Sequence, residues 1–278
     1  MERLQTAIEK ARAQRGKTSR KPVSARPGLP EARPEADPEL QARWDALAEI
    51  RLTQDRLHRN RVIAYEGGIE SAPYDMLRTR MLLQARKNGW RRIALVSPHS
   101  KCGKSTTAAN LAFSLSRQRD LHCMVLDFDL RRAGLTTILG QHSAFCMADV
   151  LERKADFADQ ARRYSSNIAF GFNNGAKVRN PSEILQSPQT AEVLDEITAT
   201  YAPDIMLFDM PPLMASDDNF AFLQNVDCAL ILVAAEKTTM SQIDVAERNV
   251  AELTNVMGIV LNKCRYMTGA HGTEYDYY

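Results

Sequence analysis

The amino-acid sequence predicts an α/β fold in which a mainly parallel, doubly wound sheet is covered by helices on both faces. Six short runs of apolar residues are separated, for the most part, by segments with helical periodicity. Continuous apolar runs are typical of strands that are buried on both sides of a parallel sheet. In such a sheet, sites form at the carboxyl ends of the strands. The expected strands cover residues 91–97, 122–129, 168–172, 204–210, 228–235 and 257–263.

The length and composition fit one large domain with an appendage. The chain has 278 residues, of which 44% are hydrophobic and 25% charged, as is usual for a soluble protein. No stretch approaches the roughly 18 uncharged apolar residues of a membrane span. The first residues, MERLQTAIEKARAQRGK, lack the apolar centre of a signal peptide. We therefore expect a cytoplasmic protein.

The cysteines are expected to be reduced thiols. They are widely spaced and include no CxxC pair, which argues against a disulfide framework or a zinc cage. The five residues are Cys102, Cys123, Cys146, Cys228 and Cys264.

The chain is expected to divide into three parts. Residues 1–65 carry 14 Lys and Arg against 9 Asp and Glu, and they begin with a possible amphipathic helix at 2–15 that is followed by a linker with five prolines. Residues 66–267 form the α/β domain. Residues 268–278 form a mobile tail that is rich in tyrosine.

The basic arm has several possible partners. It suits anionic lipid, nucleic acid or an acidic protein surface, or it is simply a solvated tail. Because aromatic residues are not interleaved with its basic ones, direct nucleic-acid binding is not expected. A helical-looking run, 40–61, leads to the body, and Trp44 in it reads as a packing residue.

A phosphate-binding loop is predicted between the first expected strand and the next helix. The segment SPHSKCGKST joins a strand to a helical segment, which is the context that a P-loop requires. Gly103 lets the backbone approach a nucleotide, and the amides that open the helix attract phosphate. Lys104 would neutralise the β and γ phosphates, and the Ser105 hydroxyl would ligate Mg²⁺. The expected nucleotide contacts are Ser100, Lys101, Cys102, Gly103, Lys104, Ser105 and Thr106, with Asn262 and Lys263 as candidates for the base pocket.

Two further strands end in aspartates that complete this pattern. Asp127 ends the apolar run VLD, and Asp209 ends MLFD, so a chance GKST in a surface turn is the weaker interpretation. Asp209 is expected to hold Mg²⁺ through water, and Asp127 with Asp129 to orient or deprotonate an attacking hydroxyl or water. The alternative for Asp129 is a surface ion pair with Arg131 or Arg132.

With these motifs, residues 74–263 resemble the bacterial tyrosine kinase family, and in particular the separate cytoplasmic kinases that serve a transmembrane polysaccharide co-polymerase. The segment RNPSEILQSP matters most, because partitioning and division-site ATPases of the same superfamily do not usually carry it. The other matching stretches are YDMLRTRMLL, GKSTTAANLA, VLDFDLRRAGL, FDMPPLMASDD and VDCALILVAAEKTTMSQ.

The resemblance implies transfer of the γ-phosphoryl group of ATP, with Mg²⁺, to tyrosine hydroxyls in a neighbouring subunit's tail. It implies catalytic roles for Lys104, Asp127 and Asp129, and metal ligation by Ser105, Asp127 and Asp209. The implied partners are the cytoplasmic segment of the co-polymerase at the membrane, other copies of this chain and a tyrosine phosphatase.

The tail offers phosphate acceptors. Three of the eight tyrosines, Tyr275, Tyr277 and Tyr278, lie in the last four positions, and Gly269 and Gly272 precede them. Phosphates would each add about −1.5 to −2 charge and are expected to loosen an oligomer. An aromatic chain end without a role is the alternative.

The chain departs from the family pattern in two places. Ser100, Lys101 and Cys102 replace Pro-Gly-Glu in the loop, so Lys101 is expected to occupy a position that favours φ > 0. In the Glu-x-x-Arg-x-x-Arg element, which helps family members assemble into a ring, Ala72 and Asp75 stand at the first two positions and only Arg78 remains.

Two other functions fit parts of the pattern. A partitioning-type ATPase usually has an extra lysine near the start of the loop, where this chain has His99. A nucleotide-bound regulatory module of the export machinery would fit the altered loop. Cys102, beside two lysines and a helix start, also raises the hypothesis of a redox-sensitive thiol.

Overall fold

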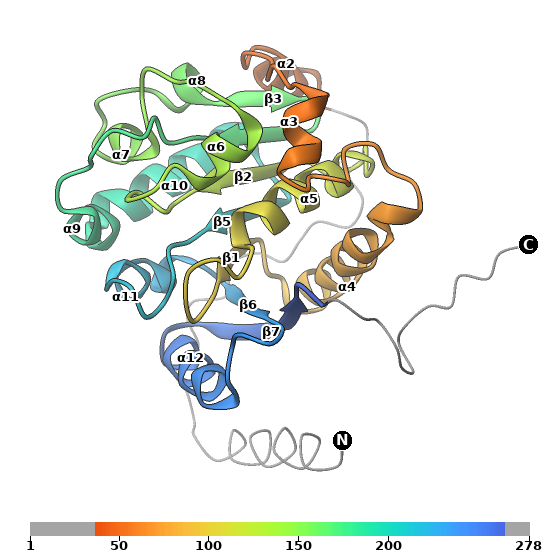
Figure 1. Cartoon of the computed structure of the whole chain (residues 1–278). Helices are drawn as coiled ribbons and strands as arrows, with labels where there is room; N and C mark the ends of the chain where they lie inside the picture. Colours follow the sequence, from red (N-terminus) through yellow and green to blue (C-terminus); the bar gives the residue numbers. More distant parts are fainter. Residues whose placement is uncertain (1–36, 265–278) are drawn as a thin grey trace, which may run out of the picture.

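A computed structural model describes residues 37–264 of the chain. Its centre is a seven-stranded sheet in the order β3-β4-β2-β5-β1-β6-β7, in which only β3 runs antiparallel to its neighbour. Strand β1 lies between β5 and β6, next to the central strand β5, so the loop after it opens within the sheet rather than at its edge (Figure 1). The strands are β1 Arg92–Val96, β2 Cys123–Asp127, β3 Arg162–Tyr164, β4 Ile168–Gly171, β5 Ile205–Asp209, β6 Cys228–Ala234 and β7 Asn255–Asn262.

Helices cover both faces of this sheet. The alternating side chains of β1 show the two layers, because Ala94 and Val96 join one buried cluster while Ile93 and Leu95 join the other. The first layer is formed with α2 Pro38–Asp45, α7 Met147–Leu151, α8 Phe157–Gln160, α9 Pro181–Gln186, α10 Pro188–Tyr201, α11 Asp218–Phe222 and α12 Met240–Leu253. The second is formed with α3 Gln54–Arg59, α4 Ala72–Asn88, α5 Lys104–Ser116 and α6 Gly134–Leu139. Two short 3₁₀ turns, Ile69–Ser71 and Leu223–Asn225, complete the elements.

The predicted fold class is confirmed, and all six expected strands are present. The short strand β3, Arg162–Tyr164, was not predicted. Its three residues are half-buried and carry no apolar run, so nothing in the sequence distinguishes them from a loop.

The boundary between the N-terminal part and the α/β domain was predicted at residue 65, but residues before it already pack against the domain. Trp44 is fully buried, and its indole Nε1 donates a 2.8 Å hydrogen bond to the Tyr201 carbonyl oxygen. Leu57 and Val62 lie in the second buried cluster. Residues 38–65 therefore belong to the packed body rather than to an arm. The helical run expected at 40–61 is divided into α2 and α3, with an isolated bridge from Glu49 to Arg163 between them.

Three sequence expectations fall wholly or mostly outside the described residues: the helix at 2–15, the proline-rich linker, and the tyrosine tail with Tyr275, Tyr277 and Tyr278. All five cysteines are free, and only Cys264 is exposed. Within residues 37–264, no helix has the length and apolar character that a membrane crossing demands.

Candidate nucleotide and phosphoryl-transfer site

The predicted P-loop connects the end of β1 to the start of α5. Gly103, the residue before the helix, has a φ of +94°, and a Cβ there would lie 2.4 Å from the amide nitrogen of Asn262. That amide nitrogen donates a 2.9 Å hydrogen bond to the Cys102 carbonyl oxygen. Only glycine fits this close approach, and it brings the end of β7 against the loop. Asn262 therefore supports the loop structurally, in addition to being the predicted candidate for the base pocket.

Lys101 has a φ of +66°, as expected for the position where family members carry glycine. A side chain at such a backbone angle is strained by about 1 kcal/mol or more. The loop thus contains a backbone angle that is unfavourable for lysine.

The Lys104 side chain lies inside the loop. Its Nζ donates a 2.7 Å hydrogen bond to Ser97 Oγ, and the residue is 8% exposed. Burial lowers the pKa of Lys104, while the nearby charges of Asp209 and Asp129 oppose this shift. The lysine is therefore a desolvated cation that is ready to meet an anion.

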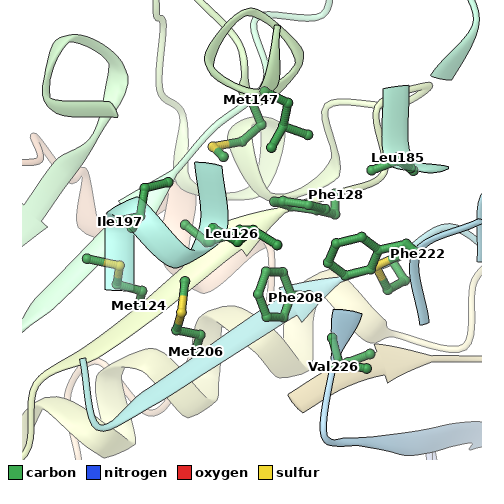
Figure 2. Close-up of a cluster of buried hydrophobic side chains, with 14 of the residues drawn as sticks. Met124, Leu126, Phe128, Met147, Leu185, Ile197, Met206, Phe208, Phe222 and Val226 are labelled. Atoms are coloured by element: carbon green, nitrogen blue, oxygen red, sulfur yellow. The ribbon is translucent and has the colours of Figure 1, made fainter. Parts of the chain in front are cut away.

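Two phenylalanines anchor the strand ends that carry the aspartates. Phe128 follows Asp127, and Phe208 precedes Asp209; their ring centroids are 5.0 Å apart, and Figure 2 shows both rings in the same apolar layer with Phe222. The Phe128 amide also donates a 2.9 Å hydrogen bond to the Asp209 carbonyl oxygen. Because side chains alternate along a strand, both carboxyl groups are directed to the other side of the sheet, where the P-loop and α5 lie.

The three aspartates form a compact acidic cluster. Asp127 and Asp209 are register partners in β2 and β5. One oxygen each of Asp127 and Asp129, and both of Asp209, are buried and have no well-formed hydrogen bond in the described part of the chain. Such oxygens are costly to bury unless a cation or donor compensates them.

Burial and mutual repulsion shift these carboxyl groups toward their neutral forms. Burial, and then the charges of Asp209 and Asp129, raise the pKa of Asp127 well above its usual value. Burial raises the pKa of Asp209 to about 6, although Lys104 and Ser105 oppose the shift. Burial also raises the pKa of Asp129, against the charges of Lys104 and Arg132.

These carboxylates fit a Mg²⁺ ion that is shared with phosphate and water. A Cβ on Gly134 would lie 2.7 Å from Ser105 Oγ and 3.9 Å from Asp209 Oδ2, so the Ser105 hydroxyl and Asp209 flank the same point. Among residues 37–264, no group of three or more His, Cys, Asp or Glu side chains could hold a metal alone. Mg²⁺ usually keeps several waters and is bound by one or two carboxylates together with substrate phosphates, so these few carboxyl groups fit it.

Arg131, one of the two arginines considered as surface partners of Asp129, pairs with another aspartate. The Arg131 guanidinium binds Asp218 through Nε at 2.7 Å and Nη2 at 2.9 Å, and it also approaches Ser182 in α9. The charges of Lys104 and Arg132 both act to lower the pKa of Asp129, and no side-chain ion pair between Asp129 and Arg131 is formed within residues 37–264. Arg131 therefore ties the loop after β2 to α9 and α11, which leaves Asp129 directed to the site.

A cavity of about 690 Å³ opens over the P-loop, which is a size that accommodates a nucleotide. Its lining brings together the predicted residues Ser100, Lys101, Gly103, Lys104, Ser105, Thr106, Asp129, Asn262 and Lys263. The Cys102 side chain is fully buried and absent from this lining; its Sγ lies 3.4 Å from His99 Nδ1. Asp127 and Asp209 are buried beneath the lining.

The cavity also has a wall that sequence reasoning missed. Arg61 and Ile63 come from the chain between α3 and α4, Tyr74 from the start of α4, and Ile138 from α6. Arg61, Ile63 and Ile138 lie outside the motifs that the sequence shows, and Tyr74 opens the matching stretch YDMLRTRMLL without a predicted role in the site. The left-handed backbone of Arg61, with a φ of +59°, is visible only in the structure.

Comparison with known proteins agrees with this site. A ParA family model, described as NUBPL iron-transfer P-loop NTPase, matches residues 90–278. Tyrosine-protein kinase YwqD of Bacillus subtilis (strain 168) is 25% identical over 225 residues, which cover 80% of this chain and 92% of YwqD.

The tyrosine-protein kinase wzc of Salmonella typhi is 27% identical over 199 residues, but these cover 71% of this chain and only 27% of wzc. Among solved structures, the chimerical protein CapA2B2 matches with a TM-score of 0.67 and 20% identity, over 79% of this chain and 94% of that one. The chain thus belongs to the ParA family of P-loop NTPases, and its similarity to relatives named tyrosine-protein kinases confirms the resemblance to the bacterial tyrosine kinases.

Proposed function

We propose that this chain is an ATP-dependent protein-tyrosine kinase that phosphorylates the tyrosine cluster Tyr275, Tyr277 and Tyr278 of a neighbouring copy. The observation that carries the proposal is the acidic cluster, whose orphaned carboxyl oxygens lie beside the desolvated Lys104 and the Ser105 hydroxyl. The relatives named as tyrosine kinases support the choice of tyrosine as acceptor.

The residues divide the work by position. Lys104 and the amides at the start of α5 bind the phosphates of ATP, and Ser105, Asp127 and Asp209 hold Mg²⁺, which neutralises charge on the transferred group. Asp129 lines the cavity, whereas the fully buried Asp127 accepts a 3.2 Å hydrogen bond from the Leu135 amide. Asp129 is thus better placed to accept the proton of an incoming tyrosine. Burial raises its pKa, which makes the carboxylate a stronger base toward a hydroxyl whose pKa is about 10.

We further propose that the kinase acts in the cytoplasm at the inner face of the membrane, where the cytoplasmic segment of a transmembrane polysaccharide co-polymerase recruits and activates it. Phosphorylation of the tail would regulate exopolysaccharide or capsule export by loosening contacts between copies, and a tyrosine phosphatase would reset them.

Transfer between copies is tested by mixing two full-length variants. The acceptor carries Lys104→Met and an intact tail; the donor keeps Lys104 and carries Tyr275→Phe, Tyr277→Phe and Tyr278→Phe. With Mg-ATP, phosphate on the acceptor's tail supports the proposal. A wild-type sample that labels its tail while the mixture stays unlabelled would restrict transfer to within one chain.

The second candidate, a regulatory module without kinase activity, is favoured by the strained Lys101 in the loop. It predicts nucleotide binding without phosphate transfer, even in the presence of the co-polymerase segment. The same mixture, supplemented with that segment, separates the two functions.

A further inference from the structure

We propose that Arg61 and Tyr74 form a second wall of the nucleotide cavity that contacts the nucleoside part of ATP and so determines how tightly it binds. This inference rests on the proposed nucleotide binding. Both residues precede residue 90, where the match to the family model begins.

The backbone of Arg61 is held in place by a buried side chain of α5. Asn110 is fully buried, and its Nδ2 donates a 3.0 Å hydrogen bond to the Arg61 carbonyl oxygen. Its Oδ1 accepts a 2.9 Å hydrogen bond from the Ala64 amide. A third bond, from Arg117 Nη1 to the Ala64 carbonyl oxygen, measures 2.8 Å. These contacts fix residues 61–64 against the helix that begins at the P-loop.

A further hydrogen bond joins the residue before Arg61 to α6. Asn60 Nδ2 donates to the Ile138 carbonyl oxygen at 3.0 Å, and Ile138 itself lines the cavity. The segment between α3 and α4 is therefore clamped to both α5 and α6. Such clamping stabilises the left-handed conformation of Arg61, which a non-glycine residue adopts only where its surroundings impose it.

The place of the clamp along α5 indicates which part of a nucleotide the wall meets. Asn110 also bonds the Thr106 carbonyl oxygen at 2.8 Å, one turn nearer the phosphate-binding end. One helical turn advances about 5.4 Å. The Arg61 backbone is therefore anchored one turn further along α5 than Thr106, away from Lys104 and Ser105 at the start of the helix, and we assign this wall to the nucleoside rather than to the phosphates.

The side chains suit a flat, polarisable group. Arg61 is exposed in the cavity, and no ion pair is formed by it within residues 37–264. Burial raises the pKa of Tyr74, and the positive charge of Arg61 opposes this rise only in part. The phenol therefore stays neutral. A guanidinium plane and a phenol ring both stack on a purine base.

The test measures binding of Mg-ATP and of magnesium tripolyphosphate, which lacks the nucleoside, by calorimetry on the full-length protein. Arg61→Gly removes the side chain and suits the left-handed backbone, so this variant is expected to melt at or above the wild-type temperature. We expect ATP to bind about tenfold more weakly and tripolyphosphate to bind as it does to wild type. Tyr74→Leu should act in the same direction.

The matched control is Arg59→Ala, which removes the same charge at the end of α3, two residues before Arg61 and outside the cavity. It should leave both affinities unchanged. Unaltered ATP affinity in a folded Arg61→Gly variant would overturn the inference while leaving nucleotide binding intact. An equal loss for both ligands would assign Arg61 to the phosphates and also overturn it. Wild-type protein that binds neither ligand would instead refute the proposed function.

Discussion

The Lys104 ammonium donates a 2.7 Å hydrogen bond to the hydroxyl of Ser97, which joins the two ends of the P-loop. The same hydroxyl donates a 2.8 Å hydrogen bond to the His99 carbonyl oxygen. The Ser97 hydroxyl is thus an uncharged hydrogen-bond partner of a buried cation. A bound triphosphate would take over this role with charged oxygens.

Replacing Ser97 with alanine is therefore expected to destabilise the nucleotide-free protein. The buried ammonium loses its hydroxyl partner, which costs about 1 to 3 kcal/mol. Saturating Mg-ATP should narrow the difference from wild type, because phosphate oxygens replace the lost partner. Urea denaturation with and without nucleotide measures both effects, and an equal difference in the two conditions would contradict them.

Lys101→Gly should stabilise the nucleotide-free protein by up to about 1 kcal/mol. Glycine adopts a φ of +66° without the clash between Cβ and the carbonyl oxygen, although it gives the unfolded chain more freedom. Lys101→Ala is the control, because it removes the same charge and keeps the strained angle. Equal unfolding free energies for the two variants would show that charge, rather than backbone strain, matters at this position.

Structural features of this chain can be predicted from the sequence when they depend on consecutive residues, and not when they depend on residues that are far apart in the sequence. The six apolar strands and the loop before α5 were predicted because their signals lie within a few consecutive residues. The partner of Arg131 could not be predicted, because Asp218 lies 87 residues away and no local pattern links the two. Trp44 reads as a packing residue, yet the sequence does not show that it packs α2 against Tyr201, 157 residues away.

Asp209→Asn should raise the stability of the metal-free and nucleotide-free protein at neutral pH. The usual aspartate pKa of 3.8 is raised to about 6 by burial, so the folded state holds this proton more tightly than the unfolded state does. The contribution of Asp209 to the stability of the wild type is then greatest below pH 3.8 and falls as the pH rises through 6, by about 3 kcal/mol.

The Asp209→Asn variant has no carboxyl group to ionise at this position, so it does not lose this stability as the pH rises. Its curve of unfolding free energy against pH should therefore separate from that of the wild type between pH 4 and pH 7. Urea denaturation across that range measures the separation. Asp120→Asn, on the exposed loop before β2, is the control and should follow wild type. Parallel curves for Asp209→Asn and wild type would refute the assigned cost of the buried charge.

Asp75→Ala should destabilise the protein by about 2 kcal/mol. Asp75 occupies a family position for arginine, but here it accepts hydrogen bonds from Ser114 and Arg117 as well as from Ser71 at 2.9 Å and Arg78 at 3.3 Å. Its removal takes away the acceptor that these donors share between α4 and α5. Asp55→Ala, an exposed acidic residue in the first turn of α3, controls for the loss of helix-dipole stabilisation. A thermal melt in which both variants behave alike would contradict a structural role for this network.

The central claim is tested most directly by incubating the purified full-length protein with Mg-ATP and analysing its C-terminal peptide by mass spectrometry. A parallel sample receives the cytoplasmic segment of the co-polymerase, and Lys104→Met serves as the control. We predict phosphate on Tyr275, Tyr277 or Tyr278 in the wild type and none in the control. An unphosphorylated tail in both wild-type samples, despite measurable ATP binding, would contradict the kinase assignment and favour the regulatory module.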